Sequence, residues 1–420
     1  MLYNIIMYAY QAGIALYSRF NGKVKKMWIG ERAAFDVLQK QVDPNAKYIW
    51  FHAASLGEFE QGRPLIERIK KEYPSYKILL TFFSPSGYEV RKNYEQADIV
   101  TYLPIDTVAN AQKFLRIVRP VMAFFIKYEF WYNYLHILRH RNIPVYSVSS
   151  IFRPDQIFFR SYGKRYSAVL KCFSHFFVQN DLSKDLLKKI GINDVTVVGD
   201  TRFDRVLQIK EASKQLPLVE KFIGYDKTKA NDDHAIKQRP VFVAGSSWLP
   251  DEEIFVKYFN EHADWKLIIA PHVIAESHLQ QIFQLLKGKK TVLYTEANEA
   301  EIADADVLII NCFGLLSSIY HYGNVAYVGG GFGVGIHNVL EAAVWGMPVI
   351  FGPNNKRFAE AQGLLASGGG FEVNNYETFA QIIEKFSSDE AYLQQSGQAS
   401  NDFVQKLSGA TDKVFTSIKL

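Results

Sequence analysis

The sequence has few of the residues and motifs on which several classes of protein depend. Its 420 residues contain only two cysteines, Cys172 and Cys312. A disulfide framework or a cysteine-rich zinc site is therefore disfavoured, and a reducing compartment fits. No Gly-x-x-x-x-Gly-Lys-Ser/Thr motif occurs, and the glycines near residue 330 lack Gly-x-Gly-x-x-Gly spacing. A P-loop enzyme and a dinucleotide-dependent oxidoreductase are thus unsupported.

Charge is absent from residues 1–18, the only long apolar stretch of the chain. Four basic residues follow it within residues 19–26: Arg19, Lys23, Lys25 and Lys26. As a helix, residues 1–18 would be ~27 Å long, just under the ~30 Å hydrocarbon core of a bilayer. Asn4, Gln11 and Ser18 recur every seven positions and would share one face. The pattern favours a helix in the membrane interface, or a short tilted span, over a helix packed on its own domain. The basic flank places it on the cytoplasmic side.

The rest of the chain alternates short apolar segments with helical ones, as in YIWFHAA, KILLTFF and VMAFFIK. This alternation predicts parallel strands with helices on both faces of a sheet. We expect two doubly wound Rossmann-like domains at residues 27–206 and 240–420, joined by a charged, strand-poor linker at 207–239. In such sheets ligands bind beyond the carboxyl ends of the strands, so the active site is predicted in a cleft between the domains.

The Ser55-Leu56-Gly57-Glu58 stretch between an apolar run and a helical pattern has two interpretations. Ser-x-x-Glu is a capping box, in which both side chains satisfy backbone N–H groups at a helix start. Alternatively, Glu58 is a reactive carboxylate at a strand end. Glu129, in an aromatic setting, is likewise either a functional acid or the ion-pair partner of a cation. Arg153 and Arg160 supply such cations, and could instead meet an anionic substrate.

In the second half, five glycines between residues 329 and 335 follow an apolar segment. Such glycines let backbone N–H groups approach an oxyanion, and a helix predicted to start near His337 would add its positive end. His337 and Glu341 would share one face of that helix, with Glu341 suited to ribose hydroxyls. The alternative is a turn that only packs helix on sheet. A zinc site at His337 is disfavoured because no second ligand stands at suitable spacing.

Other strand ends of the second half carry further candidates. Ser246 and Ser247 are either phosphate donors or an ordinary helix cap. His272 lies where a domain-facing ligand would bind, although a lone histidine of this kind is more often structural.

These motifs, in this order, resemble one family, the 3-deoxy-D-manno-octulosonic acid (Kdo) transferases of lipopolysaccharide and lipid A biosynthesis. The segments that carry the resemblance run along most of the chain: WIGER, HAASLGEFEQGRPLI, KYEFWYN, VQNDLSKDLLKKIGI, VVGDTRFD, AGSSWLPDEE and VGGGFGVGIHNVLEAAVWGMPVIFGP. The resemblance implies a GT-B glycosyltransferase that moves Kdo from CMP-Kdo to the glucosamine disaccharide of a lipid A precursor, with inversion and with neither metal nor cofactor. It also implies the cytoplasmic face of the inner membrane of a Gram-negative cell, and no nucleic-acid partner.

Carried over by position, Glu58 matches the catalytic base of the family and Glu129 its second important acid. The residues expected to bind CMP-Kdo are Ser246, Ser247, His272, Gly331, Gly335, His337, Asn338 and Glu341. Those expected on the acceptor side are Ser55, Gly57, Arg153 and Arg160. The chain departs from the family pattern at PHVIAE, the segment that contains His272, and at NCFGLLSS, where acids are replaced.

Two alternatives to a Kdo transferase remain at this level. One is another GT-B enzyme, such as a UDP-sugar transferase or a sugar-nucleotide 2-epimerase. The other is a membrane-bound protein that binds a sugar nucleotide without turning it over, which would need neither Glu58 nor Glu129.

Overall fold

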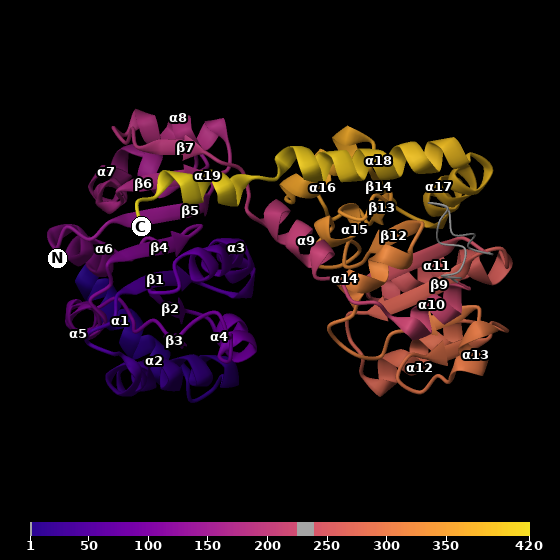
Figure 1. The fold of residues 1–420 in the computed structure, drawn as a ribbon, viewed down its shortest axis with the longest axis horizontal. Coiled ribbons are helices and arrows are strands. Elements are labelled where there is room, and N and C mark those ends of the chain that lie inside the picture. The colour runs from indigo at the N-terminus through magenta and orange to yellow at the C-terminus, as the bar shows by residue number, and fades with distance from the viewer. Residues whose placement is uncertain (1, 225–238) are drawn as a thin grey trace. The chain divides into compact units, whose positions relative to one another are not determined.

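The computed structural model describes residues 2–224 and 239–420 and divides into two compact units (Figure 1). The first contains Met1–Arg205 and Ser408–Leu420, and the second contains Val206–Leu407. The predicted boundaries at residues 206 and 240 therefore need two corrections. Residues 206–224 belong to the second unit as helices, and the last 13 residues return to the first unit. The remainder of the predicted linker, residues 225–238, lies outside the described residues.

The first unit is built on a seven-stranded parallel sheet with strand order β3-β2-β1-β4-β5-β6-β7. Its strands are β1 (Tyr48–Ala53), β2 (Lys77–Phe82), β3 (Ile99–Tyr102), β4 (Met122–Ile126), β5 (Val145–Ser150), β6 (His175–Val178) and β7 (Val195–Val197). Its helices are α1 (Leu2–Tyr17), α2 (Gly22–Gln41), α3 (Leu56–Glu72), α4 (Pro85–Arg91), α5 (Val108–Val118), α6 (Tyr132–His140), η1 (Ile157–Phe159), η2 (Ser161–Gly163), α7 (Lys164–Ser167), η3 (Ala168–Cys172), α8 (Asp181–Lys189), α9 (Arg202–Glu211, which crosses into the second unit) and α19 (Ala410–Ser417).

Both faces of this sheet are buried, as expected for a doubly wound fold. Along β1, Tyr48 and Trp50 pack in one apolar cluster, whereas Ile49 and Phe51 pack in another. Side chains of α5 and α6 contribute to the first cluster, and side chains of α3 and α19 to the second. The C-terminal helix thus completes the core of the first unit.

The second unit repeats this design with a seven-stranded parallel sheet of order β10-β11-β9-β8-β12-β13-β14. Its strands are β8 (Val241–Ser247), β9 (Lys266–Pro271), β10 (Thr291–Leu293), β11 (Val307–Ile309), β12 (Val325–Val328), β13 (Val349–Phe351) and β14 (Gly370–Glu372). Its remaining helices are α10 (Pro217–Ile223), α11 (Leu249–Glu261), α12 (Glu276–Leu285), α13 (Glu299–Ala303), α14 (Leu316–Ile319), η5 (Tyr320–Tyr322), α15 (Leu340–Ala343), α16 (Ala359–Ser367), α17 (Tyr376–Ser388) and α18 (Glu390–Leu407).

The predicted class, two α/β units with parallel sheets, is confirmed. The predicted strands all form, and β14 is added to them. This three-residue strand sits in a glycine-rich stretch too short to produce a periodic pattern. In each sheet the strand order reverses direction between two neighbours, β1 and β4 in the first and β8 and β12 in the second. Such switch points are where doubly wound sheets bind ligands.

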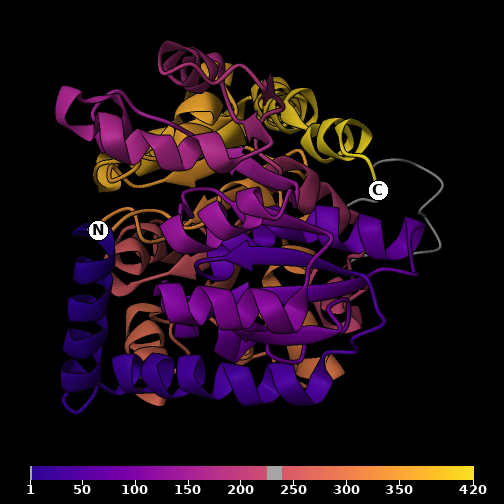
Figure 2. The ribbon, with the colours of Figure 1, turned by 90° about the vertical axis from the view of Figure 1, so that its left-hand side faces the viewer.

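The N-terminal stretch is helical, as predicted, and its polar positions face the first unit. In α1 Asn4 and Gln11 are half-buried, and Ser18 just beyond the helix is buried; Asn4 accepts a hydrogen bond from Asn133 Nδ2 at 3.0 Å. The polar stripe therefore packs on the first unit and leaves an apolar face outside. Figure 2 shows α1, in indigo, turning sharply into α2. Among residues 2–224 and 239–420, no helix is long and apolar enough to cross a bilayer.

Candidate functional site

Glu58 lies in the first turn of α3, directly beyond the carboxyl end of β1. Ser55 is the N-cap residue, but its side chain makes no capping hydrogen bond. Its hydroxyl instead donates to the carboxylate of Glu58. Neither half of the predicted capping box forms, so that interpretation of Glu58 is wrong. The carboxylate, with a side chain that is 20% exposed, is available for another purpose, and Lys127 Nζ lies 3.9 Å from it.

Glu129 lies in the loop after β4, the strand next to β1 at the switch point of the sheet. Its Oε2 accepts a hydrogen bond from Trp131 Nε1 at 2.7 Å and lies 3.1 Å from His52 Nε2. The side chain of His52 is fully buried, whereas that of Glu129 is 14% exposed. The carboxylate is therefore fixed from behind by two ring nitrogens and reaches the surface at its edge.

Further polar contacts behind Glu129 hold His52 in place. Trp50 Nε1 donates to Thr81 Oγ1 at 2.8 Å, so the Thr81 hydroxyl can donate to His52 Nδ1 at 2.9 Å. His52 Nδ1 also lies 3.2 Å from the backbone carbonyl of Thr81, and its Nε2 lies 3.1 Å from both Glu129 Oε2 and Trp131 Nε1. A buried histidine needs such partners on both nitrogens. The network thus fixes the position of the Glu129 carboxylate.

Arg153 and Arg160 do not pair with Glu129, so the ion-pair interpretation with these cations is wrong. Both side chains are exposed. The Arg153 guanidinium lies 5.8 Å from the centre of the Tyr128 ring, and Arg160 Nε donates to the backbone carbonyl of Asp155 at 3.4 Å. The segment between them nonetheless lies near Glu129, because Gln156 and Glu129 line the same pocket, which is described next. Gly57, in the first turn of α3, has open space where a Cβ would stand, with only Ser55 Oγ at 3.9 Å.

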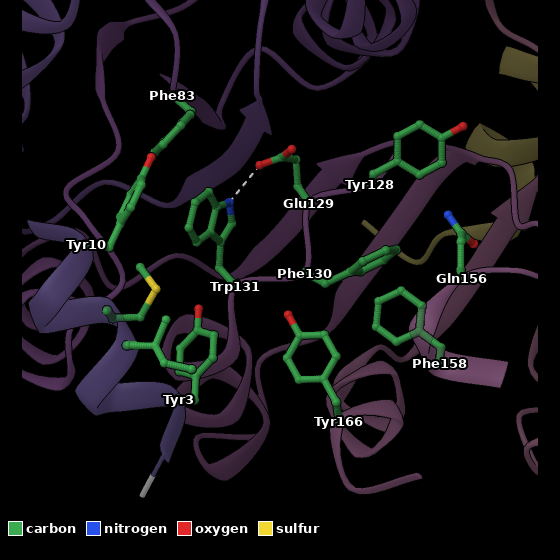
Figure 3. Close-up of a pocket in the computed structure, with 12 residues that line it drawn as sticks. Tyr3, Tyr10, Phe83, Tyr128, Glu129, Phe130, Trp131, Gln156, Phe158 and Tyr166 are labelled. Carbon is green, nitrogen blue, oxygen red and sulfur yellow. Dashed lines mark hydrogen bonds between the residues drawn. The ribbon is translucent and has the colours of Figure 1, made fainter. Parts of the chain in front are cut away.

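A pocket of about 500 Å³ adjoins Glu129 (Figure 3). Figure 3 shows the Trp131 indole nitrogen turned toward the Glu129 carboxylate, with aromatic rings around the rest of the space. Helix α1 contributes one wall and the loop after β4 another. The lining residues are Tyr3, Ile6, Met7, Tyr10, Phe83, Tyr128, Glu129, Phe130, Trp131, Gln156, Phe158 and Tyr166. A largely apolar pocket with one carboxylate at its edge suits a ligand with both an apolar and a hydroxyl-bearing part.

The glycine-rich stretch of the second unit is a compact turn after β12. The backbone N–H of Gly335 donates to Gly330 at 3.2 Å, and that of His337 donates to Gly329 at 3.1 Å. Gly331 lies so close to Gly352 that a Cβ added to Gly331 would stand 2.5 Å from the Cα of Gly352. Gly335 has φ of +134°, which only glycine adopts readily. These glycines therefore allow close packing of the turn itself.

The helix after this turn starts later than predicted. Helix α15 begins at Leu340, so His337 precedes it and does not share a helical face with Glu341. Asn338 takes the place of a cap, because its Oδ1 accepts from Leu340 N at 3.2 Å while its Nδ2 donates to Glu341 at 2.9 Å. Asn338 and Glu341 are thus brought together. Because α15 is short, its N-terminus contributes little positive potential for binding an anion.

His337, His272 and Trp248 form a stack of rings beside the turn. The His272 and His337 ring centres are 4.4 Å apart, and Trp248 lies 4.8 Å from His272. Burial lowers the pKa of both histidines, and His272 adds to the lowering for His337. Both rings are therefore neutral at pH 7, with His337 Nε2 accepting from Trp248 Nε1 at 3.3 Å. Among the described residues no cluster of three or more His, Cys, Asp or Glu side chains is arranged to hold a metal.

Ser246 and Ser247 end β8 beside the same turn but face different surroundings. Ser247 is buried, and its hydroxyl donates to Glu252 at 2.7 Å, which in turn bonds to His278 at 2.8 Å. That hydroxyl is committed to the interior. Ser246 is half-buried with φ of +52°, an unusual conformation for serine. Its backbone carbonyl lies where a Cβ on Gly329 would stand, so the ends of β8 and β12 touch.

Sequence reasoning missed the side chains that hold the two carboxylates: His52, Thr81, Lys127 and Trp131. A signal existed for His52, because a polar ring inside an otherwise apolar strand is unusual. Lys127 has φ of +64°, a strained conformation at a strand end that only the structure reveals.

Two seven-stranded parallel sheets, each with polar groups at its switch point, are consistent with the GT-B fold. Most of the chain has this fold in common with UDP-GlcNAc 2-epimerase of Neisseria meningitidis, with a TM-score of 0.60 at 13% identity over 88% of this chain and 98% of that one. At this identity the likeness concerns the fold alone.

Residues 28–205 match the family model of 3-deoxy-D-manno-octulosonic-acid transferases (Kdo transferases). A Kdo transferase of Aquifex aeolicus is 28% identical over 334 residues, 78% of this chain and 82% of that one. A bifunctional glycosyltransferase/methyltransferase of Fusobacterium nucleatum is 26% identical over 407 residues. That alignment covers 92% of this chain but only 59% of the longer relative. Together these matches support a Kdo transferase with a GT-B fold.

Proposed function

We propose that this protein transfers Kdo from CMP-Kdo to the glucosamine disaccharide of a lipid A precursor, with inversion at the anomeric carbon. The observation that carries the proposal is the state of Glu58. Its carboxylate is not used as a helix cap, is partly exposed, and lies at the switch point one strand from Glu129. A general base needs such an available carboxylate within reach of the acceptor hydroxyl.

In this mechanism Glu58 accepts the proton of the acceptor hydroxyl as its oxygen attacks the anomeric carbon of Kdo. Ser55 donates to the carboxylate and fixes its orientation. Lys127, 3.9 Å away, lends positive charge to the same edge. The CMP leaving group departs with its phosphate carrying the electron pair of the broken bond. Donors near the glycine-rich turn would stabilise that developing charge.

Glu129 is proposed to position the acceptor by accepting a hydrogen bond from one of its sugar hydroxyls. The bonds from His52 and Trp131 support this role, because they hold the carboxylate at a fixed place and leave its edge exposed. The adjacent aromatic pocket would receive the apolar part of a lipid acceptor. Its lining by α1 supports that assignment, since α1 also presents an apolar surface to the outside.

We further propose that the protein works on the cytoplasmic face of the inner membrane, held there by the outer face of α1. Leu2, Ile5 and Leu16 are 71%, 58% and 61% exposed, and Phe20 just beyond the helix is 80% exposed. The basic residues that follow are also exposed and would meet anionic headgroups: Arg19, Lys23, Lys25 and Lys26. An amphipathic helix flanked by cations binds a membrane interface by these two contributions.

The test of the proposed activity uses the full-length protein with CMP-Kdo and a tetra-acylated lipid A precursor, with product detected by mass spectrometry. Transfer of Kdo is expected, together with release of CMP. Turnover with a UDP-sugar instead would identify another GT-B enzyme. Binding of CMP-Kdo without turnover would identify a non-catalytic binding protein.

Membrane docking is tested separately, because deleting residues 1–18 would also remove one wall of the pocket. Ile5→Gln, Leu16→Gln and Phe20→Gln together change only exposed side chains outside the pocket lining. We expect this triple variant to lose most binding to vesicles containing anionic lipid. Val90→Gln, at a side chain of similar exposure on α4, is the matched control. Unchanged vesicle binding of the triple variant would contradict the docking proposal.

A further inference from the structure

The donor site assembled above is short of positive charge. CMP-Kdo carries two negative charges, one on the phosphodiester and one on the sugar carboxylate. The predicted donor residues offer hydroxyls, amides, glycine backbone, two histidines that are neutral at pH 7, and the carboxyl group of Glu341. None of these neutralises an anion, and a desolvated anion needs a cation or several strong donors.

A second pocket, of about 600 Å³, lies directly against the outer side of the glycine-rich turn. Val334 of the turn forms one wall, and the segment after β13 forms another with Lys356 and Arg357. Glu372 at the end of β14 completes it. The pocket therefore carries two cations against one carboxylate.

Arg357 is held at the turn by direct contacts. Its Nη2 donates to the backbone carbonyl of Val334. A Cβ added to Gly335 would stand 2.6 Å from the same nitrogen, so the guanidinium crosses this glycine. The guanidinium also lies 5.1 Å from the centre of the Phe358 ring. Within the part of the chain that the structure describes, neither Arg357 nor Lys356 forms an ion pair, so both retain charge for a ligand.

The opposite wall of the pocket is suited to hydroxyl groups. The Glu372 carboxylate accepts from Asn355 Nδ2 at 2.7 Å and from Asn374 Nδ2 at a longer 3.4 Å. Asn354 is tied to the turn, because its Nδ2 donates to Gly333 at 2.6 Å and its N–H donates to Gly331 at 2.9 Å. An oriented carboxylate and amides opposite a pair of cations match a polyhydroxylated sugar that bears a carboxylate.

We propose that this pocket binds the sugar-acid half of the donor, with Arg357 and Lys356 pairing with its carboxylate and Glu372 accepting from its hydroxyls. The pocket then selects an acidic sugar, while the ring stack and Glu341 bind the nucleotide. The inference rests on the proposed function, since it assigns the sugar end of the same donor.

The experiment compares two ligands that differ only in the sugar acid. Calorimetric titration with CMP and with CMP-Kdo is carried out on the wild type, on Lys356→Gln/Arg357→Gln, and on Lys287→Gln/Lys406→Gln. The last variant removes the same net charge from exposed lysines elsewhere on the second unit. We expect the pocket variant to bind CMP as the wild type does and to bind CMP-Kdo at least tenfold more weakly. The control variant should bind both ligands normally.

The single variant Lys356→Gln tests whether the double variant acts only by distorting the glycine-rich turn, because it leaves the Arg357 contact with Val334 intact. It should weaken CMP-Kdo binding by an intermediate factor with unchanged CMP binding. Equal weakening of both ligands in the double variant would assign the cations to the phosphate or to the fold, and would overturn the inference. So would unchanged CMP-Kdo affinity. A wild type that binds neither ligand would overturn the proposed function, and this inference with it.

Discussion

The two units use the same fold and the same edge of the sheet, yet they furnish that edge differently. At the switch point of the first unit stand two carboxylates, each held by hydrogen bonds from its own loop or strand neighbours. At the switch point of the second unit stand glycines packed backbone to backbone and neutral histidines. Just beyond lie Lys356 and Arg357, two cations with no ion pair among the residues that the structure describes. The carboxylates of the first unit are suited to accepting a proton, and the cations of the second unit are suited to binding an anion. Fold alone therefore says little about chemistry, which depends on the loops.

Replacing the proposed base tests this division most strongly. Glu58→Gln keeps the shape of the side chain and its bond to Ser55 but cannot accept a proton. We expect turnover to fall on the order of 10²–10⁴-fold, with CMP affinity unchanged because CMP binds the other unit. Glu72→Gln, at the far end of the same helix, is the matched control. Near-normal turnover of Glu58→Gln would remove the base from this edge.

Buried carboxyl groups differ between the units as well. Glu31 on α2 is 3% exposed, and neither oxygen has a hydrogen-bond partner among the described residues. In the second unit the buried Asp251 accepts from Tyr327 and from the N–H of Gly330. Burial raises the pKa of Glu31 from 4.5 to about 8. The folded protein therefore keeps this proton at a pH where the unfolded chain has released it.

The sign of the resulting pH dependence follows from that difference. Stability linked to Glu31 is fully present below pH 4.5 and is lost as the pH rises toward about 8. The slope approaches about 1.4 kcal/mol per pH unit. Glu31→Gln should remove this slope, so its free energy of unfolding should gain on the wild type between pH 5.5 and 8. Urea unfolding at both pH values measures it, with exposed Glu377→Gln as control. Parallel pH dependence of variant and wild type would contradict the prediction.

On the second unit, Glu341→Ala tests the nucleotide side of the comparison. Loss of a hydrogen bond to a charged group should weaken CMP binding by roughly 1.5–3 kcal/mol. Glu341 is only half-buried, so the fold should survive, as melting temperature will show. Calorimetry measures the affinity, and Glu377→Ala again serves as control. Unchanged CMP affinity would place Glu341 outside the site.

The smallest effect is expected from Trp131→Phe, which removes one of the two bonds that hold Glu129. His52 still bonds to the carboxylate, so we expect kcat/KM for the acceptor to fall only about tenfold, near 1.4 kcal/mol. Most of the change should appear in the KM for the acceptor, with CMP-Kdo affinity unchanged. Trp265→Phe removes a similar indole bond from the second unit, to Ser387. Equal effects of the two substitutions would indicate a general loss of stability rather than positioning.

Local patterns in the sequence determined much of this protein. The alternation of apolar and helical segments predicted two parallel α/β sheets, and the strand ends marked Glu58, Glu129 and the glycine-rich turn. These features follow from short-range rules. The period of apolar side chains distinguishes strands from helices, and residues after a strand lie at the sheet edge where ligands bind. The helix at residues 2–17 was predicted for the same reason.

What the sequence left open was decided by contacts between segments far apart in the chain. The spacing of Ser55 and Glu58 allowed a cap or a reactive acid, and the observed bond between their side chains excluded the cap. The seven-residue spacing of Asn4, Gln11 and Ser18 showed that they share one face of a helix, but not whether that face is buried. The contact between Asn4 and Asn133 shows that it packs against the first unit. His52 and Thr81 meet only because β1 and β2 pair in register, and Arg357 reaches Gly335 only because β12 and β13 are neighbours. The spacing of apolar residues shows whether a segment is a helix or a strand. Which side chains meet across a sheet depends on how whole strands pair, and no local spacing encodes that pairing.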